Sequence, residues 1–163
     1  MYKVRARRVA FLGVMTALAL ILSYVESLVP LPVVGVKLGL ANLVTLFLLY
    51  RGRAYEVILV TAVRIALTSL LFGSLLSLFY SFMGATASLA VTLLLKRTKI
   101  FSSIGVSVGG AVFHNLGQLA AAVIILGEST VFYLPLLLVS GVVMGTVIGL
   151  LAALLIQKVP SIL

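Results

Sequence analysis

The chain has 163 residues, of which 63% are hydrophobic and 9% are charged, and its formal net charge is +9. Because a soluble domain carries about 25% charged residues, this composition excludes a soluble globular protein and predicts one that lipid covers. The sequence contains no cysteine, which excludes disulfides and thiolate metal sites.

Six apolar runs follow one another along the chain, and each predicts a membrane-spanning helix. The first has a basic start like that of a signal peptide, but its apolar run is longer than a cleavable core, so we expect a retained helix. The second run is the shortest. The third and fourth are separated only by Gly73 and its neighbours, so hydropathy alone leaves five spans possible. The runs cover residues 9–29, 36–50, 55–71, 75–95, 104–126 and 132–156.

Basic residues decide between five and six spans, because cytoplasmic loops collect Lys and Arg. Six spans leave Lys37 alone on one side of the membrane, whereas five would move residues 96–99 to that side. The sequence therefore predicts an all-α integral membrane protein: one domain over residues 1–163, six transmembrane helices, and both termini in the cytoplasm. Topology explains the positive charge, so no nucleic-acid partner is expected. The opposite side receives Lys3, Arg5, Arg7, Arg8, Arg51, Arg53, Lys96, Arg97, Lys99 and Lys158.

Several polar side chains lie within or beside the apolar runs. A charged residue at the bilayer centre costs about 2.5–3.5 kcal/mol, so Arg64 is expected to face other helices or a hydrated cavity. Two interpretations remain open. In one, Arg64 joins helices by pairing with Glu26 or by capping backbone carbonyls; in the other, part of the polar group lines an outward-opening pocket for an anionic or electron-rich ligand. A hydrogen bond between helices explains His114 equally well. The candidate ligand-binding residues are Tyr24, Glu26, Lys37, Asn42, Arg64, His114, Asn115 and Gln118.

Small residues recur at spacings that let helix backbones approach closely. Gly141, Gly145 and Gly149 form such a stripe in the last run, and we expect it to pack inside the protein. The fourth run aligns three serines with a glycine, and the same packing role is expected there. Gly13 and Ala17 in the first run form a stripe that is a candidate docking site for a partner protein. The stripe of the fourth run comprises Ser77, Ser81, Gly84 and Ser88.

Catalytic motifs are missing. No glycine-rich phosphate loop follows any segment, so the chain does not bind ATP by that route. One histidine and no aspartate make a metal-dependent enzyme implausible, and neither a metal nor a cofactor is expected. An intramembrane enzyme would have only Glu26, Arg64 and His114 to use.

Three stretches resemble the Gx transporter family, whose members are commonly labelled heptaprenyl diphosphate synthase component I. They are SYVESLVPLPVVGVKLGLANLVTLFLLY (23–50), FGSLLSLFYSFMGATASL (72–89) and GVSVGGAVFHNLGQLAAA (105–122). That family is similar in size and topology to the substrate-binding S components of energy-coupling factor (ECF) transporters. The resemblance implies a six-helix protein of the prokaryotic plasma membrane that works with a membrane coupling protein and ATPase subunits.

The resemblance also implies a function: capture of a small vitamin-like or precursor molecule, such as a flavin or a quinone or prenyl precursor. It would place Glu26, Lys37 and Asn42 around the first loop, with Arg64 and the residues of the histidine helix deeper. The alternative is a non-transporting membrane component of a redox or prenyl/quinone-synthesis assembly. Synthase activity in the chain itself is not expected, because prenyl diphosphate synthases bind diphosphate through magnesium on aspartate-rich motifs.

Overall fold

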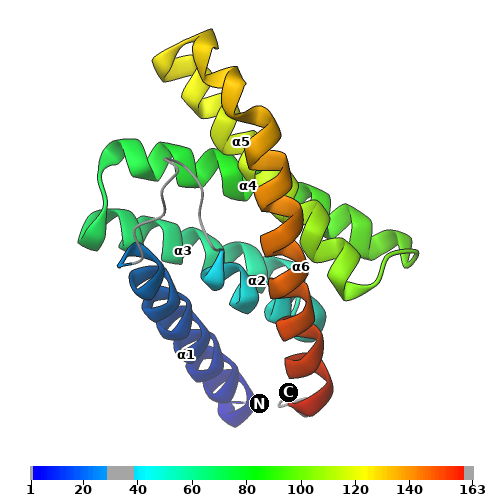
Figure 1. Ribbon diagram of the computed structural model, residues 1–163. Helices are drawn as coiled ribbons and strands as arrows, with labels where there is room; N and C mark the ends of the chain where they lie inside the picture. Colours follow the sequence, from blue (N-terminus) through cyan, green and yellow to red (C-terminus); the bar gives the residue numbers. More distant parts are fainter. Residues whose placement is uncertain (1, 29–38, 160–163) are drawn as a thin grey trace.

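The computed structural model describes residues 2–28 and 39–159, and all the regular structure in these two ranges is helical (Figure 1). The prediction of an all-α protein with six helices, in place of the five-span alternative, is confirmed. The elements are α1 (Tyr2–Ser27), α2 (Leu40–Arg51), α3 (Ala54–Phe72), α4 (Leu75–Thr98), α5 (Ser103–Leu126), the short 3₁₀ helix η1 (Glu128–Tyr133) and α6 (Leu134–Lys158).

The helix ends follow local signals in the sequence. Ser74 begins α4 by accepting a hydrogen bond from the backbone N–H of Ser77 at 3.2 Å, and Ser102 does the same for Gly105 at the start of α5. A serine in this position satisfies one of the backbone donors that a helix leaves unpaired. Gly73 is extended and lies between α3 and α4, so the weakly marked break is a true helix boundary.

Five of the six helices are long and apolar enough to cross a membrane: α1, α3, α4, α5 and α6. Their outer faces leave Leu70, Leu75 and Ile124 exposed by 77%, 82% and 69%. Exposing such apolar surfaces to water is unfavourable, whereas contact with lipid acyl chains is not. The structure is therefore that of a multi-pass membrane protein.

Helix α2 is the exception among the predicted spans. Its 12 residues extend about 18 Å at 1.5 Å per residue, which is less than the roughly 30 Å of a hydrocarbon core. Its apolar residues instead form the protein core, where Val44, Leu48 and Leu49 are almost fully buried. A helix is confirmed over Leu40–Arg51 of this predicted run, and residues 36–38 lie outside the described part.

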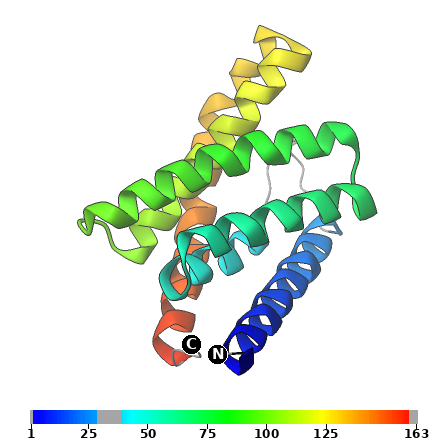
Figure 2. The ribbon, with the colours of Figure 1, turned by 180° about the vertical axis from the view of Figure 1, so that it is seen from behind.

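Glycines set the close packing of α5 against its two neighbours, α4 and α6 (Figures 1 and 2). A Cβ atom added to Gly145 would lie 2.7 Å from the Cα of Val108. Gly141 and Gly149 approach the α5 backbone in the same way. The predicted internal packing of the last glycine stripe is thus confirmed.

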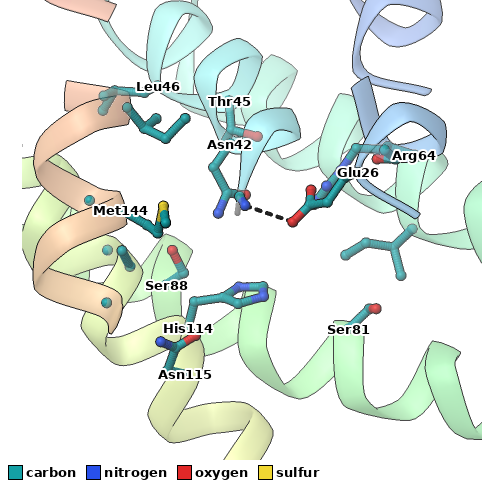
Figure 3. Close-up of a pocket in the computed structure, with 18 of the residues that line it drawn as sticks. Glu26, Asn42, Thr45, Leu46, Arg64, Ser81, Ser88, His114, Asn115 and Met144 are labelled. Carbon is teal, nitrogen blue, oxygen red and sulfur yellow. Dashed lines mark hydrogen bonds between the residues drawn. The ribbon is translucent and has the colours of Figure 1, made fainter. Parts of the chain in front are cut away.

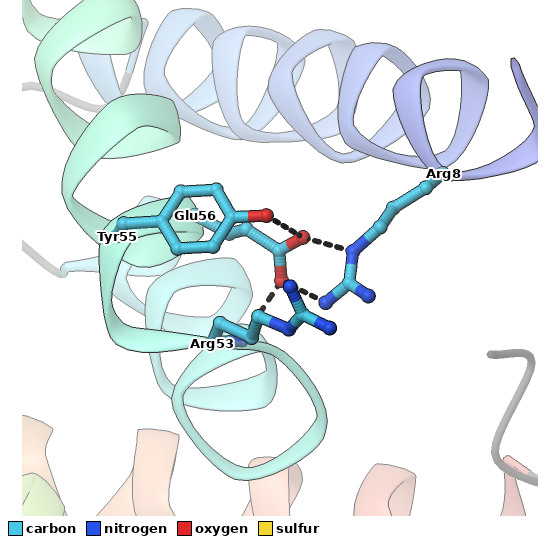
Figure 4. Close-up of polar contacts among 4 residues, drawn as sticks. All are labelled: Arg8, Arg53, Tyr55 and Glu56. Atoms are coloured by element: carbon cyan, nitrogen blue, oxygen red, sulfur yellow. Dashed lines mark hydrogen bonds and ion pairs between the residues drawn. The ribbon is translucent and has the colours of Figure 1, made fainter. Parts of the chain in front are cut away.

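Basic side chains join several helix ends on one side of the molecule. Arg8 in α1 forms an ion pair with Glu56 in α3 (Figure 4). Lys96 near the end of α4 donates to the backbone oxygen of Leu49 near the end of α2. The first and last described residues also lie near one another (Figures 1 and 2). This arrangement brings the basic clusters to the same side of the bundle.

Arg51 closes the C-terminal end of α6, because its Nη2 donates to the backbone oxygens of Ile156 and, at 2.7 Å, Val159. The last carbonyls of a helix have no partner inside the helix. We expect Arg51→Met to make amide hydrogen exchange in the last turn of α6 about three- to tenfold faster and to leave α3 unchanged. Arg97→Met, which alters an exposed side chain, is the control. Unchanged exchange in that turn would contradict the capping role.

Candidate functional site

A cavity of about 430 Å³ lies between the helices, and all six contribute to its wall (Figure 3). Ligand pockets span about 300–1,000 Å³, so this one has room for a small molecule. Among the candidate residues from the sequence, the wall contains Glu26, Asn42, Arg64, His114 and Asn115. They come from α1, α2, α3 and α5, and the fold brings them together.

Arg64 is the charged group that the sequence places deepest in a span. Its Nε atom is buried and has no hydrogen-bond partner among the described residues. Glu26 is near enough to attract it electrostatically, and the two lie side by side in Figure 3. However, the one direct ion pair within the described ranges joins Arg8 and Glu56. The structure therefore does not show a direct Arg64–Glu26 ion pair, which was one form of the structural interpretation.

Glu26 instead binds the start of α2. Its Oε1 accepts a hydrogen bond from the backbone N–H of Gly39 at 2.7 Å. Gly39 has φ 74° and immediately precedes the helix, a left-handed conformation that glycine adopts without strain. A carboxylate is favourable at this end of a helix because backbone N–H groups and the helix dipole are positive there. Part of the charge of Glu26 is thus used within the protein.

The three polar residues of α5 have different environments. His114 lines the cavity and is 9% exposed. Asn115 also borders the cavity, but its Nδ2 donates to the backbone oxygen of Leu137 at 2.8 Å and lies 3.2 Å from the Oγ of Ser140, so it ties α5 to α6. Gln118 is buried but does not belong to the wall. Its side chain lies against Gly84 of α4.

The other sequence candidates that the structure describes lie away from the cavity wall. Tyr24 is 44% exposed, and its ring centroid is 4.9 Å from that of Phe72. Lys37 is outside the described residues. Gly13 and Ala17 are exposed on α1, and a Cβ added to Gly13 would meet no atom within 4 Å. Docking of a partner protein at this stripe stays a prediction.

Sequence reasoning missed the hydroxyl groups of the wall. Ser77, Ser81 and Ser88 of α4 line the cavity, although the sequence interpretation assigned their stripe to helix packing. Two members of that stripe also fit the packing expectation: a Cβ at Gly84 would lie 2.9 Å from the backbone oxygen of His114, and a Cβ at Gly110 of α5 would lie 3.2 Å from the Oγ of Ser88. The available signal was that serines, unlike glycine, carry a group that needs a hydrogen-bond partner.

The fold and the cavity define a class: a multi-pass helical membrane protein with a cavity among its helices, lined by both polar and apolar residues. The sequence model of the family described as heptaprenyl diphosphate synthase component I matches residues 15–155. The chain belongs to this family, which confirms the resemblance noted from its motifs. No curated protein and no solved structure gives a significant match.

Proposed function

We propose that this chain is the substrate-binding membrane subunit of a transporter for a small polar molecule, acting as the S components of ECF transporters do. The observation that carries the proposal is Arg64, whose Nε is buried beside a polar cavity without a hydrogen-bond partner among the described residues. A charge within a membrane-spanning segment is unfavourable and marks a functional site by default. A ligand group that binds the arginine offsets part of that cost.

Transport also needs an energy source, and the sequence has no phosphate-binding loop for ATP. The proposal therefore includes a membrane coupling protein and ATPase subunits as partners, with the exposed Gly13 and Ala17 of α1 as the place where the coupling protein docks. By the rule that cytoplasmic loops are rich in Lys and Arg, the basic side of the bundle faces the cytoplasm of a prokaryotic cell. Both termini and the docking helix start on that side, and the wall near Glu26 and Gly39 faces outward.

Ligand-dependent stabilisation tests the proposal. We expect at least one compound from a panel of small carboxylates, sugar phosphates, flavins and quinone precursors to raise the Tm of the full-length protein in detergent. A ligand at 100 times its Kd stabilises a protein by about 2.7 kcal/mol, which corresponds to about 5–10 °C for a chain of this size.

Two neighbouring residues of α5 provide matched variants. His114→Ala removes a side chain of the cavity wall and should abolish the ligand-induced shift, whereas Phe113→Ala alters a side chain that is 43% exposed and outside the wall and should keep it. A folded wild-type protein whose Tm responds to no compound in the panel would refute the proposal. A His114→Ala protein with a lower Tm but an undiminished ligand shift would assign the histidine to helix packing.

The description of the family as component I of a synthase favours a second candidate. The chain would then be a non-transporting membrane component of a prenyl/quinone-synthesis or redox assembly, holding an intermediate for a partner enzyme. Under both candidates we propose that the chain itself does not transfer prenyl groups, because its sequence has no aspartate to hold a magnesium diphosphate. Stable copurification with a synthase subunit, without ATPase subunits and without uptake into vesicles, would favour the second candidate.

A further inference from the structure

The chemistry of the cavity wall restricts the ligand beyond "small and polar". Among the described wall residues there is one phenylalanine and neither tyrosine nor tryptophan. Ten wall residues carry a hydroxyl group instead, and they come from all of α1 to α6. A hydroxyl buried against hydrocarbon or an aromatic face without a hydrogen bond is unfavourable, so this wall disfavours a polyprenyl chain and a flat ring system. The hydroxyl residues are Ser23, Ser27, Thr45, Thr68, Ser77, Ser81, Ser88, Thr92, Ser107 and Ser140.

Two side chains of α3 in the cavity wall have a buried polar atom without a hydrogen-bond partner among the described residues. Thr68 follows Arg64 by four residues, which places both on one face of the helix, and both line the cavity. The Oγ1 of Thr68 and the Nε of Arg64 are buried and have no hydrogen-bond partner among the described residues. Both atoms carry a hydrogen that they can donate. One oxyanion group of a ligand satisfies both donors, and bonds from arginine to such a group are among the stronger ones.

Hydroxyls elsewhere in the wall differ in what they offer. Thr92 donates to the backbone oxygen of Ser88 at 2.9 Å, and Ser140 donates to Leu137 at 3.0 Å, so these two hydroxyls present mainly lone pairs to the cavity. Within the described part of the chain, the Oγ atoms of Ser77 and Ser88 make no hydrogen bond, so they can both donate and accept. Such a mixture recognises hydroxyl groups of a ligand, which also donate and accept.

Glu26 limits the charge of the ligand. Arg64 and Glu26 are the charged side chains among the described wall residues, one of each sign. A ligand with one negative charge is attracted by Arg64 and repelled by Glu26. A phosphate dianion or a diphosphate brings further repulsion from Glu26, and among the described wall residues it meets no cation besides Arg64. The wall therefore favours a carboxylate over a diphosphate.

We propose that the ligand is a small, non-aromatic, hydroxylated monocarboxylate, whose carboxylate binds Arg64 and Thr68 and whose hydroxyls bind the serines of α4. This inference rests on the proposed function, because it names the substrate class for the same cavity. It excludes prenyl diphosphates and flat aromatic anions as the preferred occupants.

The test measures binding of five probes to the full-length protein in nanodiscs by calorimetry at millimolar concentration. D-gluconate has both features, hexanoate has only the carboxylate, sorbitol has only the hydroxyls, 2-naphthoate is a flat aromatic anion, and geranyl diphosphate is a prenyl anion. We expect D-gluconate to bind at least about tenfold more tightly than each of the other four, since each hydrogen bond to a charged group contributes about a factor of ten or more.

Substitutions on α3 then locate the carboxylate. Thr68→Val keeps the side-chain shape and should weaken D-gluconate binding about tenfold, and Arg64→Gln should weaken it at least about tenfold. Thr86→Val is the matched control, because Thr86 is exposed, lies outside the wall and donates to Phe82 at 2.8 Å. If Arg64→Gln does not fold, the effect of Thr68→Val on D-gluconate binding alone tests where the carboxylate binds.

The other possible results of these binding measurements would contradict either the substrate class or the proposed function. Tighter binding of 2-naphthoate or geranyl diphosphate would overturn the substrate class and leave the proposed function standing. D-gluconate binding no tighter than hexanoate or sorbitol, or insensitive to Thr68→Val, would overturn the proposed recognition of both groups. Failure of a folded protein to bind any of the five, together with no response to the wider panel above, would refute the proposed function as well.

Discussion

Replacement of Gly117 by alanine is expected to destabilise the folded protein by about 1–3 kcal/mol, the usual cost of forcing an extra methyl group into a closely packed interface. A Cβ at Gly117 would lie 2.5 Å from the backbone oxygen of Met83 and 2.9 Å from the Cα of Gly84. These are backbone atoms, so no side chain can rotate away. Helices α4 and α5 must separate, and the cavity wall that His114 and the α4 serines share would shift with them.

Gly13→Ala is the matched control and should have the opposite sign. A Cβ at Gly13 would meet no atom within 4 Å, so the variant gains the helix propensity of alanine over glycine, about 1 kcal/mol, without a clash. Thermal unfolding of both variants in the same detergent measures the difference. Equal shifts of Tm in the two variants would show that α4 and α5 are not in the close contact that the structure gives them.

The helices could be predicted from sequence because their determinants are local. Apolar runs, the break at Gly73 and the serine at position 74 specify where helices begin and end, and the distribution of Lys and Arg rejects the five-span alternative. Hydropathy does not distinguish a residue that faces lipid from one that faces protein. For that reason the sequence does not show that α2, whose Leu48 is fully buried, packs its apolar residues into the protein core.

The site was only partly predictable, for a related reason. Arg64 and His114 stand out because polar groups are rare in apolar runs, and the fold does bring both to one cavity. Gln118 shares their pattern but lies one turn beyond His114, where Gly84 lets α4 approach and cover it. Glu26 binds a backbone N–H thirteen residues away, and no periodicity encodes such a contact. Serines in a small-residue stripe look like packing residues until the structure shows that they face a cavity.

Glu56→Gln is expected to lower stability by about 1–3 kcal/mol, the cost of leaving buried hydrogen-bonding groups without partners. Glu56 is 1% exposed. Its carboxylate accepts from Arg8, from the backbone N–H of Arg53 at 2.8 Å and from the hydroxyl of Tyr55 at 3.4 Å (Figure 4). A glutamine amide has the same shape, but it loses the charge and turns N–H groups toward donors. Because Arg8 belongs to α1, that helix should also loosen from α3.

Unfolding of the variants in detergent, with hydrogen exchange in α1, measures both effects. Glu128→Gln alters an exposed glutamate of η1 and should leave Tm unchanged. If the contact between α1 and α3 depends on the pair, the double variant Arg8→Gln/Glu56→Gln loses less stability than the sum of the single variants, because each already breaks the same interaction. Additive losses of stability would mean that the two side chains act independently. A Glu56→Gln protein with the same Tm as the wild type would mean that the carboxylate does not hold α1 in place.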